Sequence, residues 1–173
     1  MLDLEKEFNN LEDEEKIIFY AVGALDRPIK TKIKLHKLLF LFSNVFKDFS
    51  DLFEFDKHLF GPHSENIDYI IEELEQLGLV KCLGSQFILT EKGHNLFKHI
   101  KPKKEVLDVL EDFKSFLNDL SDDEILVFVY VSYPNYIEEA IKWEELQPKR
   151  LNIAISLLRK DKISFSKAVE IAG

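Results

Sequence analysis

The chain has 173 residues, with 23 Lys or Arg against 32 Asp or Glu, and a formal charge of −9. A hydrophobic content of 46% supports a folded core and excludes global disorder. The single cysteine, Cys82, excludes a disulfide framework and a cysteine-rich zinc site, and it suits a cytoplasmic location. No apolar run reaches the roughly 18 residues that span a bilayer, and the acidic residues 1–7 do not favour export. The acidic charge also excludes a uniformly basic nucleic-acid binder.

Hydrophobic spacing predicts a first helix over residues 11–25, and Arg27-Pro28 interrupts the pattern. A second helix over residues 31–46 starts at Thr31 as N-cap and is apolar around most of its circumference. Its polar stripe is Lys30, Lys34 and Lys37, which fits either a solvated face or a phosphate-contacting stripe. Residues 51–60 alternate partly in hydrophobicity and predict a short strand.

Residues 64–77 carry one continuous apolar stripe at helical spacing, between Ser64 as N-cap and Gly78 as terminator. Residues 79–83 and 86–89 flank the turn Gly84-Ser85 and predict a β-hairpin. Thr90 then caps a helix that continues to residue 100.

Further helices are predicted over residues 106–120, 125–131, 148–160 and 164–173, and Ser121 to Glu124 forms a capping box. These segments hold too many apolar residues for a linker. We therefore divide the chain into residues 1–101 and a helical extension, 102–173, that packs back or forms a dimer interface.

The order of helix, helix, short strand, helix and β-hairpin resembles a winged helix-turn-helix. The string Leu89-Thr90-Glu91-Lys92-Gly93 is similar to strings that close the wing in winged-helix regulators. We expect a mainly α fold with a small β-hairpin wing, followed by a helical C-terminal extension.

Three strings resemble the YwgA-like and Panacea-type winged-helix families, over about residues 14–100. They are KLHKLLF at 34–40, FGPHS at 60–64, and the helix end at 74–80. Panacea-type domains occur in antitoxins that neutralise a partner toxin, so the resemblance implies regulation or protein binding more than catalysis. Residues 154–173 are similar to the helix-turn-helix of prevent-host-death-like and UPF0175-type antitoxins, but they stop where a recognition helix would follow.

The polar face of residues 64–77 is acidic, and it is the face that a winged helix usually turns to the major groove. DNA phosphates would repel it, because binding depends mainly on Lys and Arg releasing counterions. The face suits a basic protein partner better, and a merely solvated face is the alternative. The residues assigned to partner binding are Glu65, Asp68, Tyr69, Glu72 and Glu73.

Basic residues gather elsewhere, in groups around residues 30–37, 98–104 and 149–167. Each group fits a solvated patch or a phosphate contact, and only two arginines lie in these groups, so base-specific contacts are poorly supplied. The candidate DNA phosphate contacts, including the hairpin, are Lys30, Lys34, Lys37, Lys81 and Gln86.

Histidines suggest a metal site, because Asp56, His58 and His63 surround the turn motif of Gly61, Pro62, His63 and Ser64. We favour a turn-shaping or helix-capping role for His63 and expect neither metal nor cofactor. His94 and His99 lack the i, i+4 spacing of zinc-binding pairs.

Catalytic motifs are missing from the sequence: it has no phosphate loop, no nucleophile elbow and no His-Glu-x-x-His. Cys82 is expected to be packed in the hairpin, and Trp143 to anchor a core or dimer interface. We expect a non-enzymatic regulatory or antitoxin-like winged-helix protein that acts through a protein partner or homodimer, with DNA contact secondary. The alternative is a sequence-specific transcriptional regulator, and a metal-dependent enzyme is a third.

Overall fold

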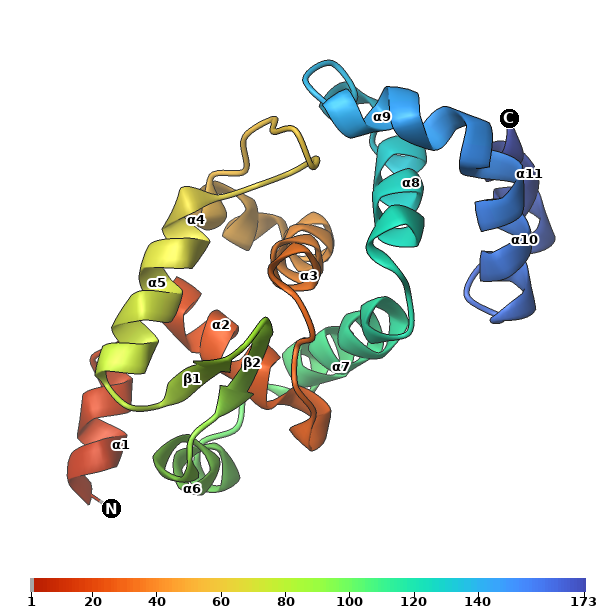
Figure 1. Ribbon diagram of the computed structural model, residues 1–173. Coiled ribbons are helices and arrows are strands. Elements are labelled where there is room, and N and C mark those ends of the chain that lie inside the picture. Colours follow the sequence, from red (N-terminus) through yellow and green to blue (C-terminus); the bar gives the residue numbers. More distant parts are fainter. Residues whose placement is uncertain (1) are drawn as a thin grey trace.

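The computed structural model describes residues 2–173, which form a mainly helical fold with a small two-stranded antiparallel sheet (Figure 1). The α-helices of the first part are α1 (Leu2–Asn9), α2 (Asp13–Gly23), α3 (Lys32–Val45), α4 (Ser50–Phe53), α5 (Glu65–Gln76) and α6 (Glu91–His99). Those that follow are α7 (Lys104–Asn118), α8 (Asp122–Ser132), α9 (Ile141–Leu146), α10 (Arg150–Arg159) and α11 (Phe165–Ala172). Within residues 2–173, no helix combines the length and apolar character needed to cross a membrane.

Short polar side chains cap the N-termini of several helices at the positions that the sequence predicts. The hydroxyl of Thr31 accepts a hydrogen bond from the Lys34 N–H at 3.2 Å, and Thr90 does the same for Gly93 at 3.0 Å. The predicted capping box is confirmed at α8, where Ser121 and Glu124 each accept the other's backbone N–H. These bonds satisfy amides that a helix leaves free at its first turn.

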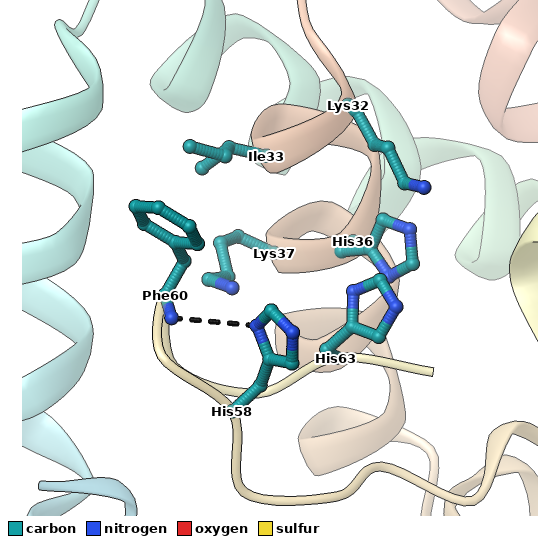
Figure 2. Close-up of a pocket in the computed structure, with 7 residues that line it drawn as sticks. All are labelled: Lys32, Ile33, His36, Lys37, His58, Phe60 and His63. Atoms are coloured by element: carbon teal, nitrogen blue, oxygen red, sulfur yellow. Dashed lines mark hydrogen bonds between the residues drawn. The ribbon is translucent and has the colours of Figure 1, made fainter. Parts of the chain in front are cut away.

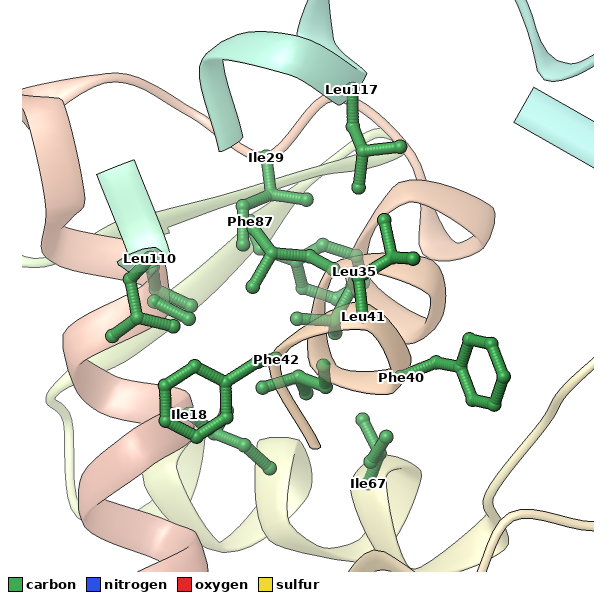
Figure 3. Packing of buried hydrophobic residues seen from close by; sticks show 14 of the residues in the cluster. Ile18, Ile29, Leu35, Phe40, Leu41, Phe42, Ile67, Phe87, Leu110 and Leu117 are labelled. Carbon is green, nitrogen blue, oxygen red and sulfur yellow. The ribbon is translucent and has the colours of Figure 1, made fainter. Parts of the chain in front are cut away.

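Apolar side chains of α2, α3, α5 and α7 meet in one core (Figure 3). Ile18 of α2, Phe42 of α3 and Ile67 of α5 are fully or almost fully buried there. Leu110 and Leu117 bring α7 into the same cluster. Burial of such side chains contributes roughly 1.5–3 kcal/mol each, so α7 is part of what stabilises the N-terminal helices.

The β-hairpin pairs β1 (Val80–Leu83) with β2 (Gln86–Leu89), as predicted. A third segment joins it, because Ile29 and Phe87 exchange both backbone hydrogen bonds, at 2.9 and 3.0 Å. The prediction that Cys82 is packed is wrong: its side chain is exposed. Ile29 lies beside β2, whereas β1 is the edge strand and its residues after Val80 are all exposed.

Residues 51–60 do not form the predicted strand. Residues 50–53 are the short helix α4, which ends because Glu54 adopts a left-handed conformation at φ 48°. The chain then closes on itself through two backbone hydrogen bonds between Asp56 and His63, at 2.8 and 3.1 Å. The alternating pattern instead reflects Phe53, which is buried, and Phe55, which packs edge-on against Phe40.

Of the helices after residue 102, α7 and α8 pack against the N-terminal part, and the later ones lie further from it (Figure 1). In Figure 1, α7 leads from that part to α8, and α9, α10 and α11 gather beyond α8. α7 packs on α2 and α3, whereas α10 and α11 pack on each other and on α8. Trp143 of α9 is half-buried, edge-on to Tyr130 and beneath the guanidinium of Arg150. The domain boundary at residues 101–102 remains a prediction.

Candidate functional site

A cavity of about 380 Å³ lies between the start of α3 and the loop that precedes α5 (Figure 2). Helix α3 contributes Lys32, Ile33, His36 and Lys37, and the loop contributes His58, Phe60 and His63. Five of these seven side chains end in nitrogen, and none is a carboxylate. The cavity therefore concentrates hydrogen-bond donors, two of them lysine amines, in a protein that is acidic overall.

The loop is shaped by the predicted turn motif. Gly61 has φ 77°, and a Cβ there would lie 3.2 Å from the ring of Tyr130 and 3.5 Å from Cε of Lys37. The conformation therefore favours glycine, and a Cβ would in addition be tight against Tyr130. Ser64 occupies the N-cap position of α5, but its hydroxyl donates to the carbonyl of Phe53 instead of capping the helix. His63 pairs with Asp56 through its backbone alone, so the turn-shaping role of its side chain stays a prediction.

Three imidazole rings stack along one side of the cavity. The rings of His36 and His63 are almost parallel, 11° apart, with centroids separated by 4.2 Å. The ring of His58 stacks on the other face of the His63 ring, with a centroid distance of 4.7 Å. Sequence reasoning did not identify His36. The available signal was a histidine beside Lys37 in a helix that is otherwise largely apolar.

Both nitrogens of His36 are used. Nδ1 accepts the Ser64 N–H at 3.3 Å, so Nε2 carries the proton and donates it to Asp68 at 3.0 Å. Burial, together with the neighbouring His63, lowers the pKa of His36 to about 4. Such a histidine has no free lone pair with which to take a proton from a substrate, so the pair with Asp68 does not form a general base.

The carboxylate of Asp68 is shared among three side chains. Oδ2 lies 2.7 Å from the Lys32 amine and 3.5 Å from His63 Nε2, and Oδ1 accepts from His36. Burial alone would raise the pKa of Asp68, but the hydrogen bonds from Lys32 and His36 hold it below its usual range. Asp68 is therefore a charged partner of the cavity wall.

His36, His63 and Asp68 bring their ligand atoms within 4.8 Å of one another, the spacing of a metal site. This set differs from the Asp56, His58 and His63 considered from the sequence. A metal ion must lie near the plane of each imidazole that binds it, yet the planes of His36 and His63 are almost parallel and meet far outside the site. The rings as placed do not fit a shared metal ion.

Lys37 and Lys114 are both buried lysines, yet their partners differ. The Lys114 amine donates to three carbonyls at the end of α2, those of Ala21, Val22 and Ala24, at 2.6–3.0 Å. Lys37, 2% exposed, donates to the carbonyl of Pro62 at 2.7 Å, and residues 2–173 supply no second acceptor. Burial lowers the pKa of each lysine to about 7.

The candidate DNA contacts on α3 are corrected by this burial. Lys34 and Lys37 are buried, because other helices pack around α3, and neither amine can reach the phosphate backbone of a DNA duplex. The amines of Lys30 and Lys34 both bind the carbonyl of Asn118 at the end of α7, where cations are favourable. Lys30 itself remains exposed, as do Lys81 and Gln86 on the hairpin.

The third basic group is largely engaged within the chain. Lys160 pairs with the buried Glu124 at 2.8 Å, and Lys162 pairs with Asp119 at 2.7 Å. Arg150 donates to backbone carbonyls at the end of α11. Lys160 and Lys162 connect the segment after α10 to α8 and to the end of α7, and Arg150 connects α10 to α11, so these cations are poorly placed to serve as free phosphate contacts.

Four of the five residues assigned to partner binding lie exposed on α5: Glu65, Tyr69, Glu72 and Glu73. Tyr69 is 63% exposed, which is high for an aromatic side chain. Asp68 differs, because it is half-buried and turned to Lys32 and His36. The outer face of α5 thus presents three carboxylates around one exposed ring.

A second exposed surface is apolar and belongs to α10 and α11. Leu151 is 60% exposed, Phe165 73% and Val169 57%, and Ile155 lies beside them. We call these four residues the C-terminal apolar strip. An apolar patch of this kind is typical of a surface that binds another protein.

Comparisons of the chain with protein-family models, with curated proteins and with solved structures gave no match.

Proposed function

We propose that the protein is a non-enzymatic, antitoxin-like regulatory protein of the winged-helix class, which acts in the cytoplasm through a protein partner or as a homodimer. The arrangement of elements supports a winged helix: α2, α3 and α5 share one core, and a β-hairpin follows them. The pairing of Ile29 with Phe87 anchors that hairpin to the segment between α2 and α3. An isolated two-stranded hairpin would be only marginally stable in water.

The acidic outer face of α5 is the observation that carries the proposal. Glu65, Glu72 and Glu73 surround the exposed Tyr69. Opposite charge steers partners together, and tyrosine is enriched at the centre of protein interfaces. A partner with a basic surface around an apolar pocket therefore fits this face, whereas DNA phosphates would be repelled by it.

The homodimer has separate support in the C-terminal apolar strip. Leu151 and Ile155 on α10 lie beside Phe165 and Val169 on α11. Two copies related by a two-fold axis would bury the same strip on each other, which is the usual geometry of a homodimer.

Capture from cells tests the partner. The wild type is compared with a triple variant, Glu65→Gln, Glu72→Gln and Glu73→Gln, which removes three charges from α5. A matched control, Glu105→Gln, Asp108→Asn and Asp112→Asn, removes three charges from the exposed side of α7. We expect one partner to be retained by the wild type and the control and lost by the α5 variant.

Sedimentation tests the homodimer. The wild type is expected to form a dimer that dissociates when Phe165 and Val169 are replaced by serine. A monomeric wild type, together with no capture that depends on the α5 carboxylates, contradicts the proposal.

A DNA-binding regulator is the second candidate, and the exposed hairpin residues Lys81 and Gln86 favour it. Affinity for an upstream operator fragment would then fall steeply with salt, and Lys81→Ala would reduce the salt dependence by about one phosphate contact. Absence of any mobility shift at low salt rules this candidate out.

A further inference from the structure

We propose that the cavity between α3 and the loop before α5 binds a small organic oxyanion, a phosphate or carboxylate group attached to an apolar group. The proposal goes beyond the regulatory function above and does not depend on it. It rests on the placement of Lys37, on the charge of the cavity lining and on the apolar residues at one side of the cavity.

Lys37 is a buried lysine whose amine pairs directly with no carboxylate of residues 2–173. The carbonyl of Pro62 occupies one of its three N–H groups, and within residues 2–173 no carboxylate forms a hydrogen bond with its amine. A buried charge without a partner is unfavourable, so an anion in the cavity would supply the missing interaction. Lys114 shows how the fold satisfies a buried amine when no cavity adjoins it, because three carbonyls take its three N–H groups.

The other polar groups of the cavity also favour an anion. The nearby carboxylate of Asp68 is not part of the lining and is already bound by Lys32 and His36. His58 and His63 each bring an imidazole to the lining, and a neutral imidazole donates one hydrogen bond. With Lys32 and Lys37 they form a set of donors on which an oxyanion can be held.

We place the apolar part of the ligand on the side of the cavity away from the histidine stack. Figure 2 shows Ile33 and Phe60 on one side of Lys37, with His36 and His63 on the other. Phe60 is 40% exposed, and a ring or alkyl group laid against it and Ile33 would remove apolar surface from water. A cavity of about 380 Å³ accommodates a small molecule of this kind.

NMR titration of the five imidazole side chains in the wild type tests the inference. Phenyl phosphate, benzoate and benzyl alcohol share a ring and differ in the head group, and sodium chloride keeps the ionic strength constant. We expect saturable shifts at His58 and His63 with at least one of the two anions, and none at His94 and His99 of α6. Whether phenyl phosphate or benzoate binds more tightly distinguishes a phosphate ligand from a carboxylate ligand.

Benzyl alcohol separates anion recognition from simple apolar binding. Equal shifts with benzyl alcohol would show that the cavity takes only an apolar group, and the inference would fail. It would also fail if neither anion moved the His58 and His63 signals. Both results come from the wild type, so they do not depend on how any variant folds.

Lys37→Met tests the residue on which the inference rests. Methionine fills a similar volume without charge, and Lys34→Met is the matched control, because Lys34 is buried on the same helix but does not line the cavity. Loss of a charge-assisted hydrogen bond should weaken anion binding by about tenfold or more in Lys37→Met and little in Lys34→Met. Unchanged affinity in folded Lys37→Met overturns the inference.

Discussion

The imidazole of His36 lies flat against that of His63, 4.2 Å away, while its two nitrogens are held by Ser64 and Asp68. A second proton on His36 would break the bond from Ser64 and place a charge beside another histidine. The stack therefore favours neutral rings, which makes the stability of the fold sensitive to acid.

We predict that the free energy of unfolding falls as the pH drops from about 6.5 to about 4. Burial and His63 lower the pKa of His36 to about 4 in the folded state, so the unfolded chain binds more protons across this range. The stabilisation by neutral His36 is complete above the pKa of this histidine in the unfolded chain, and it is lost as the pH falls to the pKa in the folded protein. It amounts to at most about 3 kcal/mol. Urea unfolding of the wild type at several pH values measures it.

His36→Gln should reduce this acid-dependent loss, because glutamine does not titrate. The control is His99→Gln, at an exposed position on α6. An equal loss in wild type and His36→Gln would contradict the role given to the stack.

A rise in stability is predicted on the alkaline side of neutrality. Burial lowers the pKa of Lys37 and Lys114 to about 7, so from there to the unfolded value near 10.5 the unfolded chain binds more protons. Stability should therefore increase between pH 7 and 9.5. The measurement stops there because burial raises the pKa of Tyr130 to about 12, which acts in the opposite direction at higher pH.

Lys114→Met is predicted to destabilise the protein at neutral pH and to flatten the alkaline rise. The carbonyls of Ala21, Val22 and Ala24 would lose their donor, at a cost of about 2 kcal/mol. Chemical unfolding at pH 7 and 9 measures both effects. A variant with wild-type stability and slope would show that the three bonds contribute little.

Gly93→Ala is predicted to be among the most damaging single changes in the chain. A Cβ at Gly93 would lie 2.1 Å from the carbonyl oxygen of Leu79, a backbone atom that cannot move without disturbing the hairpin. We expect a loss of about 3 kcal/mol or more, measured as the shift of the urea midpoint.

Gly84→Ala is the matched comparison. Gly84 has φ 62°, but a Cβ there meets no atom within 4 Å. Only the left-handed conformation is penalised, by about 1 kcal/mol. Similar losses at the two glycines would exclude the steric explanation for Gly93.

Two fragments test where the N-terminal unit ends. Leu110, Lys114 and Leu117 bury α7 against α2 and α3. Residues 1–120 are therefore expected to unfold cooperatively in urea, followed by circular dichroism. Residues 1–101, which match the division predicted from the sequence, should unfold at lower urea or without cooperativity. Equal stability of the two fragments would support the predicted boundary.

Local sequence signals predicted most of the helices and the hairpin. The caps at Thr31, Thr90 and Ser121 act over three residues, so they are visible without tertiary information. Helices α1 and α9 were not predicted, because the spacing of their apolar residues did not single them out as helices. The alternation around Phe53 and Phe55 gave a false strand because a loop can also point aromatic side chains in different directions.

Local sequence patterns could not predict the candidate cavity. It joins His36 of α3 to His63 and Asp68, residues 27 and 32 positions further along the chain. The spacing placed Lys34 and Lys37 on one helix correctly, whereas Lys30 precedes α3 and is exposed. Only the packing of other elements on α3 decides that Lys34 and Lys37 are covered. Sequence periodicity indicates which residues lie on the same face of a helix, but it does not indicate which other element packs against that face.

Asp68 binds two residues of the cavity wall, Lys32 and His36, and lies on the helix whose outer face carries Glu65, Glu72 and Glu73. A negative ligand beside Lys32 and His36 would compete for the two donors that balance this carboxylate. The unbalanced charge would add to the potential of the α5 surface, without movement of the backbone. Ligand binding in the cavity would thus change the affinity of any protein that binds the α5 surface through its charge.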